Sequence, residues 1–332
     1  DRDGVLLAST QSGQRVYCED ETVRRALLHT VGDSAGFIST SVQYSLRSKL
    51  TGYNVFTGLN DTVFNRMGSG VTLTIDAGAC AAGFSAMNGH NGGGIFYNYD
   101  TGDILCKFSA PSYDPMNVPE NIDGDPDYEG AYLDNTLSGS FTPGSIFKLV
   151  TALAAMDKFP GDWNTRTYSC WGEEEIGGSD ISCLGSHGDI DMADALGYSC
   201  NLYFAKLAND IGAENLQKTA ERLGFNRSLN FGSIEIADSQ AKLEGANQNQ
   251  LGWAGIGQYT TLANPYHMMC LMGAIAKDGS YAEPRLTKDT QLFRGLGEGN
   301  NRQLLGAAQA MDLSNLMRSN VENYYGDYLF PE

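Results

Sequence analysis

A serine and a lysine stand one helical turn apart near the middle of the chain. They are Ser145 and Lys148, within Thr-Pro-Gly-Ser-Ile-Phe-Lys-Leu at residues 142–149. Serine is a weak nucleophile near neutral pH and needs an adjacent base. A lysine three residues later in a helix lies on the same face as the serine. The spacing therefore predicts Ser145 as a nucleophile and Lys148 as its general base.

The residues before Ser145 favour a sharp entry into a helix, because Pro143 and Gly144 precede it directly. Free N–H groups and the helix dipole at such a helix start favour developing negative charge. The motif alone is weak, since a second Ser-x-x-Lys occurs at Ser239 and Lys242. The alternative for Ser145 is a helix-capping serine followed by a solvated lysine.

A second polar pair, Ser199 and Asn201, interrupts an apolar run at residues 195–204. Hydroxyl and amide groups buried in such a run need hydrogen-bond partners. Two interpretations stay open. The pair caps a helix break at Gly197, or Ser199 shuttles a proton near Lys148 while Asn201 holds a substrate amide. Another Ser-x-Asn elsewhere in the chain shows that the pattern alone does not decide.

The hydrophobic periodicity and the turn residues predict the elements that position these side chains. Residues 1–70 are predicted to form short strands and loops of an incomplete N-terminal module, ahead of a second domain at 71–332. Long irregular loops are expected at 110–140 and 160–190. The predicted regular elements are a strand at 71–76, a helix at 77–88, a hairpin of 94–99 and 104–108, and helices at 145–156, 191–210 (broken near Gly197), 213–223 and 264–277. One further sheet region is missing from this prediction.

The composition is that of a globular protein, with 42% hydrophobic and 19% charged residues among 332. The net charge is 22 − 40 = −18, which argues against nucleic acid and against passive binding to anionic lipid. Neither a signal peptide nor an apolar run of membrane-spanning length is found. The first residues resemble the middle of a protein, so we expect a trimmed sequence.

The histidines and cysteines predict no metal site. The four histidines are scattered without metal-ligand spacing, so no metal and no cofactor is expected. Seven cysteines leave at least one unpaired, and Cys170 and Cys183 bracket a Gly-rich loop where they could pair. The redox compartment stays open, because an exported protein of an anaerobe and a cytosolic protein both fit.

Several segments, in order along the chain, resemble those of class B penicillin-binding proteins, which are serine D-Ala-D-Ala transpeptidases. Ser145 to Lys148 occupies the first active-site motif of that family, and Ser199 to Asn201 occupies the second. The further matching segments are Asp-Arg-Asp-Gly-Val-Leu-Leu-Ala at 1–8, His-Thr-Val-Gly at 29–32, Val-Thr-Leu-Thr-Ile-Asp at 71–76, Thr-Gly-Asp-Ile-Leu at 101–105, Ser-Tyr-Asp-Pro at 112–115, Ile-Gly-Gln at 256–258 and Ala-Ile-Ala-Lys-Asp-Gly at 274–279. The resemblance covers nearly the whole chain.

The resemblance implies an α/β fold of the α+β type, the transpeptidase and serine β-lactamase-like fold with an antiparallel sheet flanked by helices. It implies that Ser145 forms an acyl-enzyme with peptidoglycan stem peptides and with β-lactam antibiotics. Lys148 would be the general base, Ser199 the proton shuttle and Asn201 a substrate-binding residue. It also implies an anchor helix outside this chain, a place on the outer face of the bacterial cytoplasmic membrane, and a membrane-embedded glycan polymerase as a partner.

The third motif of the family, Lys-Thr-Gly or a close variant on a strand that lines the site, is absent from this sequence. We expect truncation before that strand, and a degenerate relative is the alternative. A catalytically impaired scaffold or muropeptide-binding module therefore stays as a second function. A serine β-lactamase is a third, although the segment 1–70 and the loop 110–140 argue against it.

Overall fold

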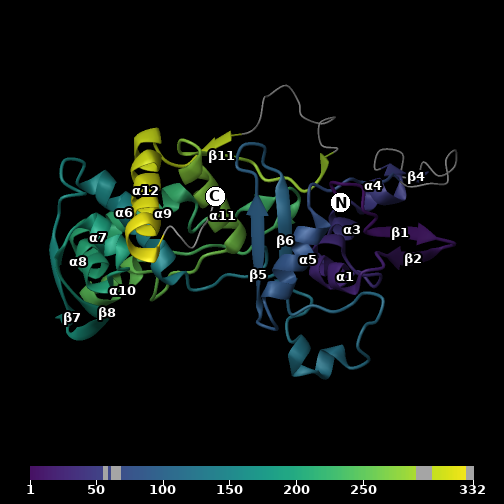
Figure 1. Ribbon diagram of the computed structural model, residues 1–332, viewed down its shortest axis with the longest axis horizontal. Helices are drawn as coiled ribbons and strands as arrows, with labels where there is room; N and C mark the ends of the chain where they lie inside the picture. Colours follow the sequence, from purple (N-terminus) through teal and green to yellow (C-terminus); the bar gives the residue numbers. More distant parts are fainter. Residues whose placement is uncertain (55–58, 61–68, 289–300, 327–332) are drawn as a thin grey trace.

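The computed structural model describes residues 1–54, 59–60, 69–288 and 301–326 (Figure 1). The molecule is elongated. The hairpin of β5 (Gly92–Tyr97) and β6 (Ile104–Ala110) stands near its middle, between a small N-terminal part and a larger helical part. The hairpin of β7 (Tyr168–Ile176) and β8 (Ser179–Ile190) lies at the far end of the helical part.

Helices dominate the described chain. Those of the N-terminal part are α1 (Glu21–Ala26), α2 (Leu28–Val31), α3 (Val42–Ser45) and α4 (Arg47–Thr51). The remaining α-helices are α5 (Ala77–Ala86), α6 (Lys148–Lys158), α7 (Met192–Gly197), α8 (Asn201–Ile211), α9 (Ala213–Leu223), α10 (Gln248–Gly255), α11 (Pro265–Ala276) and α12 (Ala307–Asn320). None of the helices among the described residues combines the length and the apolar character needed to cross a membrane.

The strands pair two by two, and each of these pairs is antiparallel. Besides the two hairpins above, the pairs are β1 (Ala8–Gln11) with β2 (Gln14–Tyr17), β3 (Tyr53–Asn54) with β4 (Leu59–Asn60), β9 (Asn230–Phe231) with β10 (Ile234–Glu235), and β11 (Ser280–Ala282) with β12 (Asn301–Gln303).

Most of the predicted elements are present near their predicted bounds. The hairpin turn includes Gly102 at φ +79°, a conformation that favours glycine. Asn264 caps α11 by accepting a hydrogen bond from the N–H of His267, and Gly224 ends α9 in the left-handed region. The predicted helix at 191–210 is broken as expected, into α7 and α8.

Beyond the N-terminal part, two predictions of regular elements are wrong. Residues 168–190 form the long β7–β8 hairpin rather than a loop, and Gly177 and Gly178 at its tip have φ values of +64° and +88°. A Gly-Gly pair between two alternating runs is itself a hairpin signal, which the prediction of a loop overlooked. Residues 71–76 do not form a regular strand: Leu73 makes one isolated bridge, to Thr287.

The N-terminal part packs against the rest of the molecule. Four short helices form there, where only strands and loops were predicted. Ala26 and Leu27 belong to the same hydrophobic core as Ile75 and Ile104. The hydrophobic core therefore continues across residue 70. The domain boundary predicted between residues 70 and 71 stays a prediction.

Two largely buried helices, α6 and α8, form the centre of the helical part. Helix α10 approaches α8 closely. A side chain at Gly255 would meet the Cβ of Ala208 at 2.4 Å, and one at Gly252 would meet the Cβ of Ala205 at 3.1 Å. This close packing fixes α10 against α8, and Thr151 of α6 donates to the carbonyl of Gly255 in α10. Helix α10 thus joins the two helices at or just before whose starts the predicted site residues lie.

Candidate functional site

Ser145 lies on a short 3₁₀ turn, Gly144–Phe147, that leads directly into α6. Gly144 has φ +57°, so the chain turns sharply there before the serine. The side chain of Phe147 is fully buried and packs edge-on against Phe225. Ser145 itself is exposed. The turn is therefore anchored on one side and presents the serine hydroxyl to solvent on the other.

Lys148 begins α6 and is buried, with 1% of its surface exposed. Its Nζ donates to the carbonyl oxygen of Ser199 at 2.6 Å, to the Ser199 Oγ at 3.0 Å and to the Asn201 Oδ1 at 2.9 Å. These three acceptors are uncharged. Burial lowers the pKa of Lys148 to about 8, although the thiols of Cys183 and Cys200 act in the opposite direction.

Ser199 and Asn201 lie at the break between α7 and α8. The Ser199 Oγ donates to the Ser145 Oγ at 2.9 Å, so Ser199 bridges the serine and the lysine. Ser199 has φ +52°, a left-handed conformation that is uncommon for serine. The amide of Asn201 donates to the carbonyl of Ser182 on β8 at 3.1 Å. The structure thus brings all four predicted site residues together, with Lys148 linked to Ser145 through Ser199.

The end of α10 and the segment that follows it hold the serine turn and α6 in place. Gly144 N–H donates to the carbonyl of Gly257 at 3.0 Å, and Thr151 donates to the carbonyl of Gly255 at 2.7 Å. Gly257 has φ +79°, and a side chain there would meet the Gly144 oxygen at 2.1 Å. A glycine is therefore required at position 257 for this close approach.

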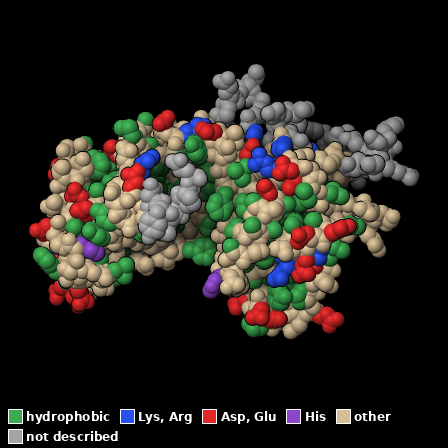
Figure 2. Space-filling model, in the orientation of Figure 1, with side chains coloured by type: hydrophobic (Ala, Val, Ile, Leu, Met, Phe, Trp, Pro, Cys, Tyr) green, Lys and Arg blue, Asp and Glu red, His purple; other side chains and the backbone are tan. Residues whose placement is uncertain are grey.

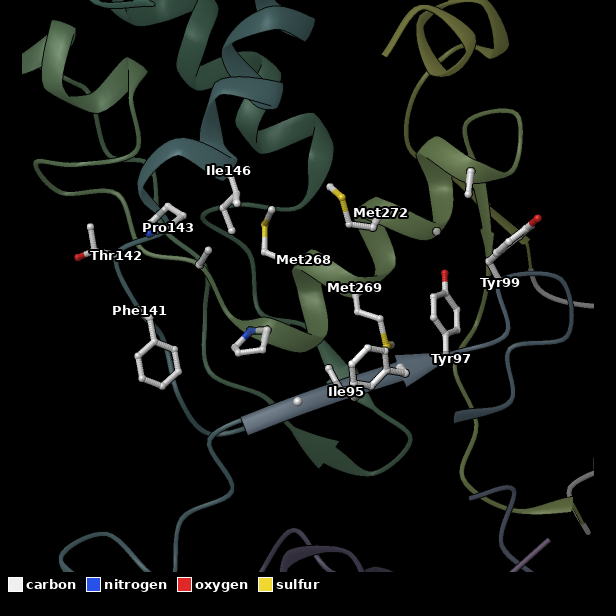
Figure 3. A pocket seen from close by; sticks show the side chains of 16 residues that line it. Ile95, Tyr97, Tyr99, Phe141, Thr142, Pro143, Ile146, Met268, Met269 and Met272 are labelled. Carbon is white, nitrogen blue, oxygen red and sulfur yellow. The ribbon is translucent and has the colours of Figure 1, made fainter. Parts of the chain in front are cut away.

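An apolar pocket of about 680 Å³ borders the serine turn. It lies between β5, helix α11 and the segment 141–146, and Met268, Met269 and Met272 point into it from α11 (Figure 3). Hydrophobic side chains also gather in the hollow near the middle of the face in Figure 2. The pocket adjoins Ser145 through its neighbour Ile146, so a ligand's apolar group could lie there while a carbonyl faces the serine.

The second Ser-x-x-Lys has the opposite arrangement. Ser239 is fully buried, and its Oγ accepts from the N–H of Asn264 at 2.9 Å and lies 2.7 Å from the Nδ1 of His267. Lys242 is exposed. The serine is thus a structural hydrogen-bonding group and the lysine is solvated, which is close to the non-catalytic alternative that the sequence left open for Ser145.

One group of side chains near the site was missed. Cys170, Cys183, His187 and Cys200 place their ligand-type atoms within 4.8 Å of one another. The description of the histidines as scattered is therefore wrong for His187. Twelve, three and twelve residues separate the four in sequence, and only the Cys-x-x-x-His step is a typical metal-ligand spacing. All seven cysteines are free thiols in the structure, so Cys170 and Cys183 are not paired.

The site combines an exposed serine with a buried lysine whose hydrogen-bond acceptors are uncharged, in a fold of helices and antiparallel strands. These features define a site of the serine-nucleophile type. The family model of the penicillin binding protein transpeptidase domain matches residues 92–329. The chain therefore belongs to the penicillin-binding proteins, and the predicted class B membership is confirmed.

Sequence relatives agree with this assignment. The chain is 26% identical over 250 residues to the peptidoglycan D,D-transpeptidase PbpA of Mycolicibacterium smegmatis, covering 67% of this chain and 49% of that protein. The chain spans half or less of the length of the curated relatives it matches.

Solved structures show the same fold. The crystal structure of PBPA from Mycobacterium tuberculosis matches with a TM-score of 0.80 and 21% identity, over 96% of this chain and 80% of that one. The penicillin G acyl-enzyme complex of the same protein matches with a TM-score of 0.79 and 22% identity, over 96% and 80%. The predicted transpeptidase and β-lactamase-like fold is confirmed.

Proposed function

We propose that the chain carries a D,D-transpeptidase site that cross-links peptidoglycan stem peptides through an acyl-enzyme on Ser145. One observation carries this proposal: the exposed Ser145 hydroxyl is joined through Ser199 to the buried amine of Lys148. A buried amine whose described acceptors are all uncharged loses its proton more readily than a solvated lysine, and a general base must be unprotonated.

In the proposed acylation, neutral Lys148 receives the Ser145 proton by way of the Ser199 hydroxyl. The Ser145 oxygen attacks the carbonyl carbon of the penultimate D-Ala, and the N–H of Ser145 stabilises the oxyanion. When the C–N bond breaks, Ser199 passes the proton to the nitrogen of the departing D-Ala. The first transfer differs from the direct one expected from the sequence, because the described contacts of Lys148 go to Ser199 and Asn201.

The remaining steps use the same groups. Asn201 donates one amide hydrogen to Ser182 and holds Lys148 with its oxygen, so its second amide hydrogen remains for the donor peptide. An amine from a neighbouring stem then attacks the carbonyl carbon of the acyl-enzyme and forms the cross-link while the bond from that carbon to the Ser145 oxygen breaks. Lys148 takes up the amine proton and returns it through Ser199 to the Ser145 oxygen. β-Lactams would acylate Ser145 in place of the stem peptide; PBPA from Mycobacterium tuberculosis forms an acyl-enzyme with penicillin G.

Covalent labelling with a fluorescent penicillin tests the proposal. We expect labelling of the wild-type chain at Ser145, located by peptide mass spectrometry, and none in Ser145→Ala. The matched control is Ser239→Ala, which removes the serine of the other Ser-x-x-Lys and should still be labelled. Labelling that survives in Ser145→Ala would contradict the assignment.

The labelling experiment and a companion hydrolysis assay distinguish two other functions. A folded chain that takes no label supports the non-catalytic scaffold. Rapid turnover of a chromogenic cephalosporin supports a β-lactamase instead, because it requires fast hydrolysis of the acyl-enzyme.

The proposed site of action is outside the cytoplasmic membrane, where peptidoglycan is cross-linked. The support is that the relatives are named as peptidoglycan D,D-transpeptidases. A membrane-embedded glycan polymerase is the proposed partner, because cross-linking needs newly polymerised strands. Co-purification from membranes with such a polymerase would test this, and its absence after cross-linking in cells would count against it.

A further inference from the structure

Three thiols and one imidazole meet at the base of the β7–β8 hairpin, beside the second active-site motif. Cys170 comes from β7, Cys183 and His187 come from β8, and Cys200 is the N-cap residue of α8. The ligand-type atoms of these four residues lie within 4.8 Å of one another. Two of the cysteines are buried and the other two residues are half-buried.

The spacing of these atoms matches a tetrahedral metal site. With Zn–S bonds of about 2.3 Å and Zn–N bonds of about 2.0–2.1 Å, a tetrahedron has S···S edges of about 3.8 Å and S···N edges of about 3.6 Å. In the structure, the sulfurs of Cys183 and Cys200 are 3.8 Å apart. The His187 Nδ1 lies 3.4 Å from the Cys170 sulfur and 3.8 Å from the Cys183 sulfur.

A disulfide or simple packing explains the group less well. A disulfide needs a sulfur–sulfur distance of about 2.0 Å, and it would use two of the three thiols and leave the imidazole without a role. Cys270 shows the packing alternative, since it is buried in α11 among hydrophobic residues. At the hairpin, by contrast, a ring nitrogen faces two of the three sulfurs.

The surroundings of the four residues suit thiolates bound to a cation. The backbone N–H of Asn201 donates to the Cys183 sulfur at 3.2 Å, and that of Tyr203 donates to the Cys200 sulfur at 3.4 Å. Such donors stabilise negative charge on sulfur, and outer contacts of this kind orient metal ligands. The ring of Tyr198 stacks on His187, with ring centroids 4.8 Å apart, and fixes the imidazole plane.

We propose that Cys170, Cys183, His187 and Cys200 form a structural zinc site. Four protein ligands, three of them thiolates, close the coordination sphere, and this is the pattern of a structural rather than a catalytic zinc. Thiolate-rich tetrahedral sites favour zinc over magnesium, calcium and manganese. The zinc displaces the thiol protons on binding and undergoes no redox change.

The position of the site gives the zinc a second consequence. Cys200 lies between Ser199 and Asn201, the two residues that hold Lys148. Cys183 accepts the N–H of Asn201, so two of the proposed ligands fix the backbone of this motif. The zinc therefore joins the hairpin to α8. It also holds Ser199 in its left-handed backbone conformation, which costs a serine energy and needs support from the surrounding structure.

Metal analysis of the purified chain tests this proposal independently of any acylation activity. The chain is prepared in reducing buffer without chelator, exposed to zinc and desalted, and zinc is measured by inductively coupled plasma mass spectrometry. We expect one zinc per chain in the wild type and in Cys270→Ser, the matched buried-cysteine control. We expect less than a tenth of that in Cys183→Ser and in His187→Ala.

Cobalt substitution of the wild-type chain covers the case in which those variants do not fold. Cobalt bound by three thiolates and an imidazole gives intense visible bands of tetrahedral geometry together with ultraviolet thiolate-to-cobalt charge transfer. A zinc content below a tenth per chain with no such spectrum overturns the proposal. A Cys170–Cys183 disulfide in the zinc-exposed protein, found by peptide mass spectrometry, overturns it as well.

Discussion

Two lysines are buried to the same extent in different parts of the molecule. Lys107 on β6 and Lys148 on α6 each expose 1% of their surface. Lys107 forms an ion pair with the fully buried Asp134 and also donates to Thr30 at 3.4 Å. Within the described part of the chain, Lys148 donates only to the uncharged acceptors of Ser199 and Asn201. Lys107 therefore has a carboxylate as its counter-charge, whereas the described contacts of Lys148 include no charged group.

The presence or absence of a counter-charge distinguishes Lys107, which has a structural role, from Lys148, which is the proposed general base. At Asp134, burial opposes the charged form, but the Lys107 ammonium, His29 and the Thr136 hydroxyl together outweigh it and lower the pKa of that carboxyl below its usual range. The pair therefore stays ionised and holds β6 to the segment after it. At Lys148, burial beside neutral acceptors lowers the pKa to about 8, so a neutral amine is accessible near physiological pH.

Replacing Lys148 should have the largest effect on acylation. We expect Lys148→Met to reduce the rate of fluorescent-penicillin labelling by about 10²–10⁴-fold, the usual contribution of a general base. Stability to urea should change little or increase, because a buried amine whose described acceptors are uncharged is removed. Lys242→Met is the control and should be labelled at the wild-type rate. If the labelling rate of Lys148→Met fell by no more than about threefold, the reduction would be far smaller than the expected range. Another group would then be the base.

Replacing the paired lysine should affect folding instead. Lys107→Met leaves the buried Asp134 carboxylate without its counter-charge, and we expect a loss of about 3–5 kcal/mol in the free energy of unfolding. The measurement is urea denaturation, and the labelling rate per folded molecule should not change. The double variant Lys107→Met with Asp134→Leu should recover most of the loss. A loss below about 1 kcal/mol in the single variant would contradict the ion pair's structural role.

The pH dependence of acylation should follow Lys148. Because its pKa is lowered to about 8, the neutral fraction rises about tenfold per pH unit below that value and then levels off. We expect labelling to be roughly fiftyfold to a hundredfold faster at pH 8 than at pH 6.

The lowered pKa of Lys148 also affects the free energy of unfolding. Between about pH 8 and the ordinary lysine value of 10.5, Lys148 is protonated in the unfolded chain and largely neutral in the folded one. The folded state therefore gains stability from this group as the pH rises through that range.

Labelling rates measured by rapid quenching across this pH range check the expectation. The stability part is checked by comparing wild type with Lys148→Met, in which the slope assigned to this lysine above about pH 8 should disappear. A labelling rate that does not change with pH around the pKa of about 8 would mean that Lys148 is not the titrating base.

The smallest effect is expected at the second Ser-x-x-Lys. Ser239→Ala removes the buried hydroxyl that contacts Asn264 and His267, and we expect a loss of about 1–3 kcal/mol in stability. The labelling rate should stay at the wild-type value. Thermal unfolding and labelling measured on the same sample test both parts, and slower acylation of the folded variant would contradict a purely structural Ser239.

Most helices could be predicted from the sequence because their signals are local. The four candidate site residues were singled out by motif spacing together with the resemblance of the surrounding segments, and the structure brings the four together. The entry turn at Gly144, the cap at Asn264 and the end at Gly224 depend on neighbours in sequence. What the sequence could not predict depends on contacts between distant residues. The bridge from Ser145 through Ser199 to Lys148 forms only when the start of α6 meets the break between α7 and α8. The cluster around His187 forms only when the β7–β8 hairpin folds against α8.

The two Ser-x-x-Lys motifs show the same limit in another way. Ser145 with Lys148 and Ser239 with Lys242 have the same local pattern. Their burial is reversed: the exposed member is the serine in the first and the lysine in the second. Burial is a property of the whole fold, so only the resemblance of the surrounding segments could separate the two motifs beforehand.

The edge of β5 has a consequence for the behaviour of this polypeptide in solution. Among the described residues, β5 pairs with β6 on one side and with no strand on the other, and Phe96 in it is 60% exposed. An open strand edge beside an apolar pocket is a template for strand addition. In solution this edge of β5 is therefore where a further strand would pair.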